Sequence, residues 1–352
     1  MTTDVIAKLH YWHDTPTVTG RFRQCHEDFK VTEQLEVAAD EPGEHQWLWV
    51  YKKGANTTFV ARQLAEFAGV SEREVSYAGL KDRHAETWQW FSVQLPGQDL
   101  LDWSQLEHPE FRVERAVKQA KKLKLGYHQG NHFVLRLRDV SNVDELKKRW
   151  DKAVAEGVPN YFGEQRFGHL GQNLTKARAW LTGELSRKQT RKWSRQQFGM
   201  LLSAARSYLF NKVVSARLEA GKVTPEQGDF MILDGSRSFF QIKELDEEIL
   251  RRWQEGDILL SAPMAGSWRG EWHEHLSEFE HQVLEPEADL VAGLKQQRVD
   301  LARRALLIKP TAAEFKQLDE SSVELRFTLV KGSFATSLLR ELMVAMASEH
   351  YN

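Results

Sequence analysis

The amino-acid sequence predicts an α+β protein in which one domain is inserted into another. Stretches that alternate between apolar and polar residues, the pattern of half-buried strands, cluster near both ends of the chain. Helical spacing of apolar residues dominates from about 172 to 222 and again over 282–306. Since 352 residues exceed one ordinary compact domain, we expect the two ends to build one α+β domain and the middle to form a mainly helical insertion.

Two strands in the first half of the chain carry paired tryptophans. Residues 45–53 (HQWLWVYKK) and 87–93 (TWQWFSV) both alternate, and each holds two tryptophans on one face. If these strands pair, the four indoles stack together. We therefore interpret the tryptophans as core residues rather than as a binding site.

The other elements follow from start and stop signals along the chain. Asn56 is a good N-cap and Gly69 a good stop for a helix over 57–68. The remaining expected elements are, in chain order, a short strand over 74–78, a strand over 132–140, a helix over 143–154, a loop over 157–168, a strand over 322–330 and a closing helix from 335.

The composition and net charge of the chain restrict the classes of protein to which it can belong. A formal net charge of −2 is too close to zero for the whole molecule to attract nucleic acid, so such contact must come from local basic patches. The single cysteine, Cys25, cannot form an internal disulfide and favours a reducing compartment. Neither a signal-peptide pattern nor an apolar run long enough for a membrane span is present. We expect a cytoplasmic protein with no membrane partner.

The loop SYAGLKDRHA places one acid among three bases. Asp82 lies beside the basic residues Lys81, Arg83 and His84. Gly79 lets another molecule approach the backbone closely. Nearby cations favour an ionised carboxylate, and an ionised aspartate is a usable nucleophile. The alternative is a solvated loop acid with charged neighbours, and the charge pattern alone leaves both interpretations open.

Two phenylalanines and one amide are further candidates for a binding site. Phe334 lies between a strand and a helix, where backbone N–H groups can hold a phosphate and a ring can stack on a base. The amide of Asn131 has a donor and an acceptor and can read a base edge. The alternatives are core packing for Phe29 and Phe334 and ordinary turn chemistry for Asn131, which follows a glycine.

Basic and histidine clusters carry weaker signals. The runs 117–124 and 187–195 are either solvated helix faces or contacts for an RNA or DNA backbone. His273 and His275 do not share a helix face and have no cysteine nearby, so we expect no metal site. The chain has no GxGxxG segment, Walker sequence or serine elbow, so no nucleotide cofactor is indicated.

Five segments, in order over nearly the whole chain, resemble the signature segments of the TruD family of tRNA pseudouridine synthases. They are AGLKDRHA (78–85), QGNHF (129–133), GVPNYFGEQRFG (157–168), AARSYLFN (204–211) and GSFATSLLREL (332–342). The resemblance implies a pseudouridine-synthase catalytic domain with a mixed, mainly antiparallel sheet, formed by residues 1–156 and 309–352. It also implies an inserted, mainly helical α/β TRUD domain formed by residues 157–308.

The resemblance implies the chemistry as well. Members of the family isomerise uridine to pseudouridine in RNA, bacterial members at position 13 of certain tRNAs, with one essential aspartate and neither metal nor cofactor. On this basis we expect tRNA as the partner, base flipping of the target, and no obligate protein partner. The implied site residues are Asp82 as the catalytic group, Phe29, Asn131 and Phe334 as nucleoside contacts, and Arg23, Lys81, Arg83 and His84 as candidate supports for charge or RNA contact.

Some points stay open at this stage. Arg23 stands where other members carry lysine, and His132 replaces a small residue in the GN-x-F segment. Asp82 has three available roles: attack on the ribose, attack on the base, or removal of a ribose proton. The rival functions are a non-catalytic RNA-binding module of the same fold and a glycoside or nucleoside hydrolase that uses Asp82 and Glu86 as a carboxylate pair.

Overall fold

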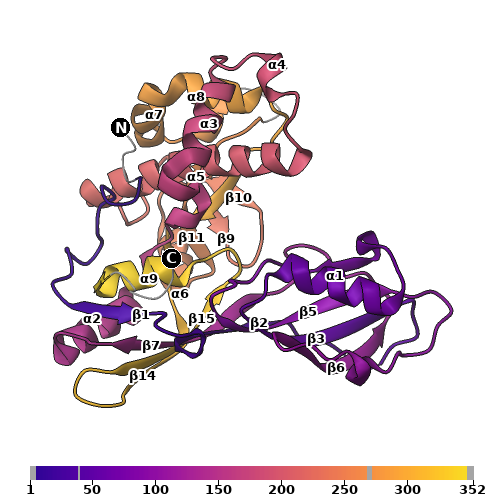
Figure 1. Ribbon diagram of the computed structural model, residues 1–352. Coiled ribbons are helices and arrows are strands. Elements are labelled where there is room, and N and C mark those ends of the chain that lie inside the picture. Colours follow the sequence, from indigo (N-terminus) through magenta and orange to yellow (C-terminus); the bar gives the residue numbers. More distant parts are fainter. Residues whose placement is uncertain (1–4, 39, 268–271, 347–352) are drawn as a thin grey trace. The chain divides into compact units, whose positions relative to one another are not determined.

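The computed structural model describes residues 5–38, 40–267 and 272–346, which form two compact units (Figure 1). Residues 16–156, 309–335 and 342–346 form one, here called the sheet unit. Residues 5–15, 157–308 and 336–341 form the other, here called the helical unit. The units change over between 156 and 157 and between 308 and 309, and residues 5–15 and 336–341 lie with the helical unit. These two segments bond to each other, because the Glu341 carboxylate accepts from the backbone N–H groups of Trp12 and His13, each at 3.1 Å.

A mixed, mainly antiparallel sheet is the framework of the sheet unit, as the family resemblance implies. Its strands are β1 (Thr19–Phe22), β2 (Phe29–Gln34), β3 (His45–Lys53), β4 (Val75–Tyr77), β5 (Glu86–Gln94), β6 (Phe111–Gln119), β7 (Gly130–Arg138), β14 (Thr311–Gln317), β15 (Val323–Val330) and β16 (Val344–Ala345). The main path runs β14-β15-β7-β2-β5-β3-β6, and along it the β2–β5 pair is parallel and the other pairs are antiparallel. β4 pairs with β5, and β1 pairs with β7 and β16.

Helices α1 (Thr57–Ala68) and α2 (Val143–Glu156) lie on the same face of this sheet. α1 packs on a core that includes Leu48, and Trp150 of α2 contacts Phe327 with ring centroids 5.8 Å apart. Register partners on neighbouring strands share a face. One row of such partners crosses the sheet on this face and consists of Phe327, Phe133, Val31, Thr87 and Lys52. The helix-covered face therefore also carries a lysine.

The predicted pairing of the two tryptophan strands is confirmed, but the predicted stack of four indoles is wrong. Trp90 contacts Trp49 and Trp47, with ring centroids 5.3 and 6.3 Å apart. Trp88 instead contacts Tyr51, at 5.0 Å. The β3–β5 register explains the difference, because it sets Tyr51 opposite Trp88.

Several element boundaries differ from the prediction. β6 and β14 were not predicted, and both lie at the ends of the main strand path, where side chains need not alternate in polarity. The segment predicted as helix over 282–306 ends instead in a strand, β12 (Ala302–Ala305). The closing helix, α9 (Ala335–Leu342), begins at the predicted residue and is followed by a strand, β16, which was not predicted.

The helical unit packs helices against a small four-stranded sheet (Figure 1). Its longest helix begins after Ser194, whose hydroxyl accepts from the Gln197 N–H at 3.1 Å, and buries Leu209, Phe210 and Val213 completely. No helix in the described part of the chain is long and apolar enough to cross a membrane. The elements are α3 (Gln172–Leu181), α4 (Arg187–Thr190), α5 (Arg195–Glu219), α6 (Glu247–Glu255), α7 (Glu278–Leu284) and α8 (Ala288–Lys295), the sheet β10 (Phe239–Gln241), β9 (Phe230–Leu233), β11 (Ile258–Met264) and β12, and the pair β8 (Val158–Pro159) and β13 (Leu307–Ile308).

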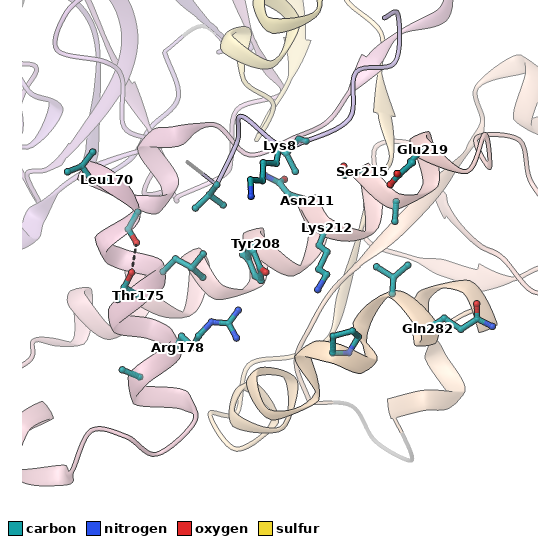
Figure 2. Close-up of a pocket in the computed structure, with 18 of the residues that line it drawn as sticks. Lys8, Leu170, Thr175, Arg178, Tyr208, Asn211, Lys212, Ser215, Glu219 and Gln282 are labelled. Carbon is teal, nitrogen blue, oxygen red and sulfur yellow. Dashed lines mark hydrogen bonds between the residues drawn. The ribbon is translucent and has the colours of Figure 1, made fainter. Parts of the chain in front are cut away.

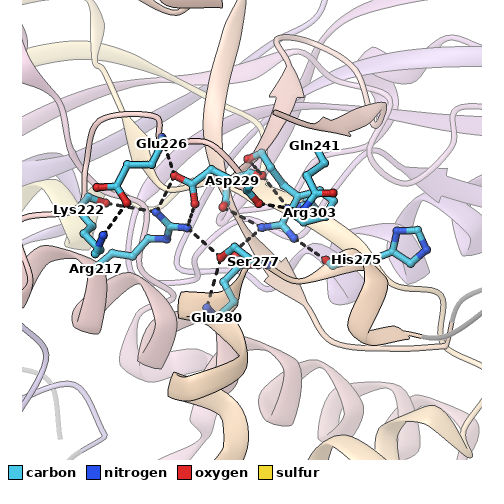
Figure 3. Close-up of polar contacts among 12 residues, drawn as sticks. Arg217, Lys222, Glu226, Asp229, Gln241, His275, Ser277, Glu280 and Arg303 are labelled. Carbon is cyan, nitrogen blue, oxygen red and sulfur yellow. Dashed lines mark hydrogen bonds and ion pairs between the residues drawn. The ribbon is translucent and has the colours of Figure 1, made fainter. Parts of the chain in front are cut away.

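Two buried ion pairs lie in the core of the helical unit (Figure 3). Arg303 on β12 pairs with Glu280 on α7, and all of this pair is inaccessible to solvent. Arg217 on α5 pairs with Asp229, and its guanidinium also reaches the Ser277 hydroxyl at 3.4 Å. The pairs therefore tie α5, α7 and β12 together through charged groups that are buried.

Candidate active site

The loop that carries Asp82 connects β4 to β5 in the sheet unit, and hydrogen bonds fix it to neighbouring elements. The Lys81 N–H donates to the Thr57 hydroxyl at the start of α1, at 3.0 Å. The same hydroxyl donates to the side-chain oxygen of Gln89 on β5, and the Gln89 amide donates to the Gly79 carbonyl, both at 3.0 Å. Both anchored residues precede Asp82, and they tie its loop to α1 and to β5.

Both oxygens of the Asp82 carboxylate have a donor. Arg23 Nη2 lies 2.9 Å from Oδ2, and the backbone N–H of His84 donates to Oδ1 at 3.0 Å. The Asp82 side chain is 17% exposed and the Arg23 side chain 21% exposed, so the pair is half-hidden rather than solvated. A carboxylate held in this way is pre-oriented and remains accessible to a ligand.

Arg23 joins Asp82 to the aromatic part of the site. Its guanidinium lies over the Phe29 ring at 4.1 Å, a cation–π contact. Burial lowers the pKa of Arg23, while the charge of Asp82 opposes that shift. The Arg23 backbone has a φ of 62°, a left-handed conformation that costs a non-glycine residue about 1 kcal/mol or more. Such local strain is typical of functional sites.

Phe29 and Asn131 lie on adjacent strands. Phe29 is buried, and its ring packs edge-on against Phe133 with centroids 6.2 Å apart. Asn131 is the second residue of β7, and its side-chain oxygen is buried with no hydrogen-bond partner among the described residues. A buried acceptor left without a donor costs about 1–3 kcal/mol. The Asn131 amide is therefore ready to accept from a ligand.

The turn that leads to Phe334 leaves the sheet beside Asn131. The β15–β7 register sets Val330 opposite Gly130, and the Lys331 N–H donates to the Gln129 carbonyl at 3.0 Å. Glycine is required at 130, since a Cβ there would collide with the Leu329 carbonyl. The Phe334 side chain is partly exposed.

The basic neighbours of Asp82 in the sequence have other partners. The buried Lys81 ammonium pairs with Glu33 at 2.7 Å. Arg83 is exposed and donates to the Gly54 carbonyl at 2.9 Å, and the His84 ring stacks on His26 with centroids 6.3 Å apart. The cation at the carboxylate is Arg23, which is remote in sequence.

Two buried polar residues in this region were missed by the sequence analysis. Lys52 on β3 is fully buried and donates to loop carbonyls, and Glu33 accepts from both Lys81 and the Trp90 N–H. A usable signal existed for Lys52: it takes the inward position after Leu48 and Val50 in an alternating strand, where an apolar side chain is expected.

The proposed carboxylate partner of the hydrolase alternative faces elsewhere. Glu86 accepts from the Tyr51 hydroxyl at 2.9 Å and pairs with Lys30 at 3.1 Å. It is the register partner of Lys53, whose side chain points to the sheet face opposite that of Lys52.

No group of three or more metal-binding side chains occurs within residues 5–38, 40–267 and 272–346. The side chain of His273, considered above as a ligand, lies outside the described residues.

A cavity of about 790 Å³ in the helical unit contains none of the candidate site residues (Figure 2). Beside it, the Glu287 carboxylate accepts from Tyr208 at 2.7 Å, Arg178 at 2.8 Å and Lys212 at 2.9 Å. Burial acts to raise the pKa of Glu287, but these donors outweigh burial and lower it. Glu287 is thus held ionised by two cations, which leaves a net positive charge on these three side chains.

Comparison with known proteins assigns the family. The model of the family described as tRNA pseudouridine synthase D (TruD) matches residues 6–187 and 183–342. Proteins named tRNA pseudouridine synthase D from Idiomarina loihiensis and Proteus mirabilis are 44% and 42% identical, each match covering 96% of both chains. The crystal structure of a candidate TruD protein from Methanosarcina mazei has the same fold, with a TM-score of 0.67 and 23% identity over 96% of both chains. The chain belongs to the TruD family.

Proposed function

We propose that this protein isomerises uridine to pseudouridine in tRNA, at position 13, with Asp82 as the catalytic group. The observation that carries the proposal is the Asp82 carboxylate held by Arg23, whose guanidinium lies over the buried ring of Phe29. Family membership and the names of relatives over 40% identical support the same reaction. A tRNA substrate implies work in the cytoplasm, in agreement with the single cysteine, Cys25.

The reaction needs a positioned carboxylate and a rotating base. The bond between N1 of the uracil and C1′ of the ribose breaks, and a bond between C5 and C1′ forms. The C5 proton passes to solvent and N1 gains a proton, so atoms balance without an oxidant, a reductant or a second substrate. Asp82 takes part by attack on the ribose, attack on the base or removal of a ribose proton.

We assign the residues around Asp82 to binding of the uridine rather than to the steps that break and form bonds. Flipping a nucleotide out of its stack costs a few kcal/mol, which aromatic side chains and backbone contacts offset. The Asn131 oxygen lacks a donor and can accept from the uracil N3–H while the detached base turns. Phe334 and Phe29 are the rings proposed to stack on it.

We assign the catalytic domain to residues 1–156 and 309–352, which include the whole sheet unit, and the inserted TRUD domain to residues 157–308. All four proposed contact residues, Phe29, Asp82, Asn131 and Phe334, belong to the sheet unit. The helical unit is then available to bind other parts of the tRNA.

Tritium release tests this function. A tRNA transcript labelled at C5 of uridine should lose one tritium per tRNA to water, with no change in RNA length or mass. A transcript with cytidine at position 13 is the control and should lose none. Free uracil in the supernatant would indicate the hydrolase alternative, and binding without tritium loss would indicate the non-catalytic module.

A further inference from the structure

Lys52 is a fully buried lysine that the proposed chemistry does not use. It lies on the helix-covered face of β3, beyond Leu48 and Val50, and its exposed fraction is 0%. Burying an ammonium group is costly unless every N–H finds an acceptor. The contacts of the Lys52 ammonium therefore indicate the role of this residue.

The three N–H donors of the Lys52 ammonium meet three backbone carbonyls. Lys52 Nζ lies 2.8 Å from the backbone oxygen of Asp82, 3.0 Å from that of Ala55 and 3.4 Å from that of Lys81. Two of these carbonyls belong to the loop that carries the catalytic group, and the third belongs to the turn between β3 and α1. One side chain thus clamps two loops.

We propose that Lys52 is the positioning residue for Asp82: its ammonium fixes the backbone of residues 81 and 82 and so sets the direction of the carboxylate. This inference rests on the proposed function of Asp82. The two polar side chains that support the same loop, Thr57 and Gln89, hold the backbone at Lys81 and Gly79. Lys52 binds the carbonyl of Asp82 itself, so its loss affects the angle of the catalytic side chain most directly.

The protonation state of Lys52 provides a readout that simple packing does not. Burial lowers its pKa to about 8, and of the charged groups facing it Asp82 raises and Lys81 lowers the pKa. The neutral amine has two N–H groups for three carbonyls, so the rate should fall as pH rises through 8.

Stability should move in the opposite direction. Between pH 8 and the ordinary lysine pKa of 10.5, the unfolded chain binds a proton at Lys52 that the folded chain does not. The unfolding free energy contributed by this group therefore rises with pH in that window. If the reaction rate falls over the pH range in which the unfolding free energy contributed by Lys52 rises, then Lys52 acts by positioning Asp82 and not by stabilising the fold.

The first experiment compares Lys52→Met with Lys53→Met in single-turnover tritium release. Lys53 is the adjacent, partly exposed residue on the opposite face, paired with Glu27. Lys52→Met should lower the rate constant about 100-fold, the loss typical of a misplaced catalytic group, with tRNA affinity within about threefold of wild type. Lys53→Met should change the rate less than about threefold. Equal rates for wild type and Lys52→Met overturn the inference.

The second experiment keeps the test valid if Lys52→Met fails to fold. The rate constants of wild type, Lys53→Met and Lys52→Arg are measured from pH 6 to 10. The first two should fall through pH 8, and Lys52→Arg, which cannot deprotonate there, should not. An alkaline fall shared by all three belongs to the substrate and contradicts the role of Lys52, as does a wild-type rate that is flat to pH 10. A wild-type protein that releases no tritium at any pH refutes the proposed function instead.

Discussion

Arg23 makes two contacts at once, with the Asp82 carboxylate at 2.9 Å and with the Phe29 ring at 4.1 Å. A guanidinium is planar and offers several donors, so it can stack on a ring and bind a carboxylate together. An ammonium can neutralise the carboxylate but makes no comparable flat stacking contact. The two contacts can therefore be separated by substitution.

Arg23→Lys and Arg23→Met should differ in activity. Arg23→Met removes a charged hydrogen bond worth about 1.5–3 kcal/mol, and kcat/KM should fall roughly 10- to 150-fold. Arg23→Lys keeps the charge and should lose less than about tenfold. Single-turnover tritium release measures both, with Arg62→Met at an exposed position of α1 as the control. Equal losses for the two Arg23 variants would contradict the separation of charge and stacking.

At the scale of single residues, the sequence predicts which residues belong to the candidate site better than it predicts which residues contact one another. Asp82 was predicted to be the catalytic group from its loop and from the family resemblance, but its basic neighbours Lys81 and Arg83 bind Glu33 and Gly54 instead. The actual partner, Arg23, is brought in by a left-handed backbone turn between β1 and β2. No local pattern encodes such a contact, because it depends on how remote strands pair.

At the scale of elements, the sheet positions the site and ion pairs hold the helical unit together. The register of β2, β7 and β15 brings Phe29, Asn131 and the turn before Phe334 to neighbouring strands. In the helical unit, Arg303 and Glu280 join β12 to α7. Removal of one partner of a buried ion pair leaves the other charge buried without a counter-charge and without water.

Arg303→Met should destabilise the helical unit by about 3–5 kcal/mol, because Glu280 is left buried and charged. The double variant Arg303→Met/Glu280→Gln should recover a large part of that loss, since no uncompensated charge remains. Urea unfolding followed by circular dichroism measures both.

The control for this pair is Arg251→Met on α6. Arg251 pairs with Glu248 and Glu255 at the surface, so its loss should leave the unfolding midpoint almost unchanged. A double variant that is no more stable than Arg303→Met would show that packing, rather than the stranded charge, sets the loss.

Helices and strands were predicted correctly where the apolar residues recur with a strong period. The prediction failed for strands at the edge of a sheet and for a strand that buries a charged residue. α1 runs over the predicted residues 57–68, with Gly69 in a left-handed conformation as its stop. β14 was missed because most of its side chains are exposed. β12 (ARRA) was read as helix because a buried arginine at an inward strand position has no apolar signature.

At the scale of the whole molecule, a net charge of −2 means that RNA must be bound by local patches. The basic residues Arg187, Lys188, Arg191, Lys192 and Arg195 surround α4 and the start of α5, and all are exposed. The two-unit organisation was predictable because strands and helices are segregated along the chain. The assignment of 5–15 and 336–341 to the helical unit was not, because it depends on contacts such as those of Glu341.

Charge reversal in the 187–195 run should weaken tRNA binding. Arg191→Glu/Lys192→Glu should raise Kd and lower the magnitude of the slope of log Kd against log salt by about one to two. Lys148→Glu/Lys152→Glu on α2 makes the same change in net charge at exposed positions outside the run. Filter binding at several salt concentrations measures both. Identical slopes for the two double variants would place the RNA elsewhere.

The most direct test of the account is the Asp82→Asn variant in the tritium-release assay. The amide keeps the size of the side chain and loses its charge, so tRNA should still bind within a few-fold of wild type while release of tritium falls by roughly 10⁴-fold or more. Circular dichroism and the unfolding midpoint should match those of wild type. Turnover by a folded Asp82→Asn protein within tenfold of the wild-type rate would contradict the assignment of Asp82 as the catalytic group.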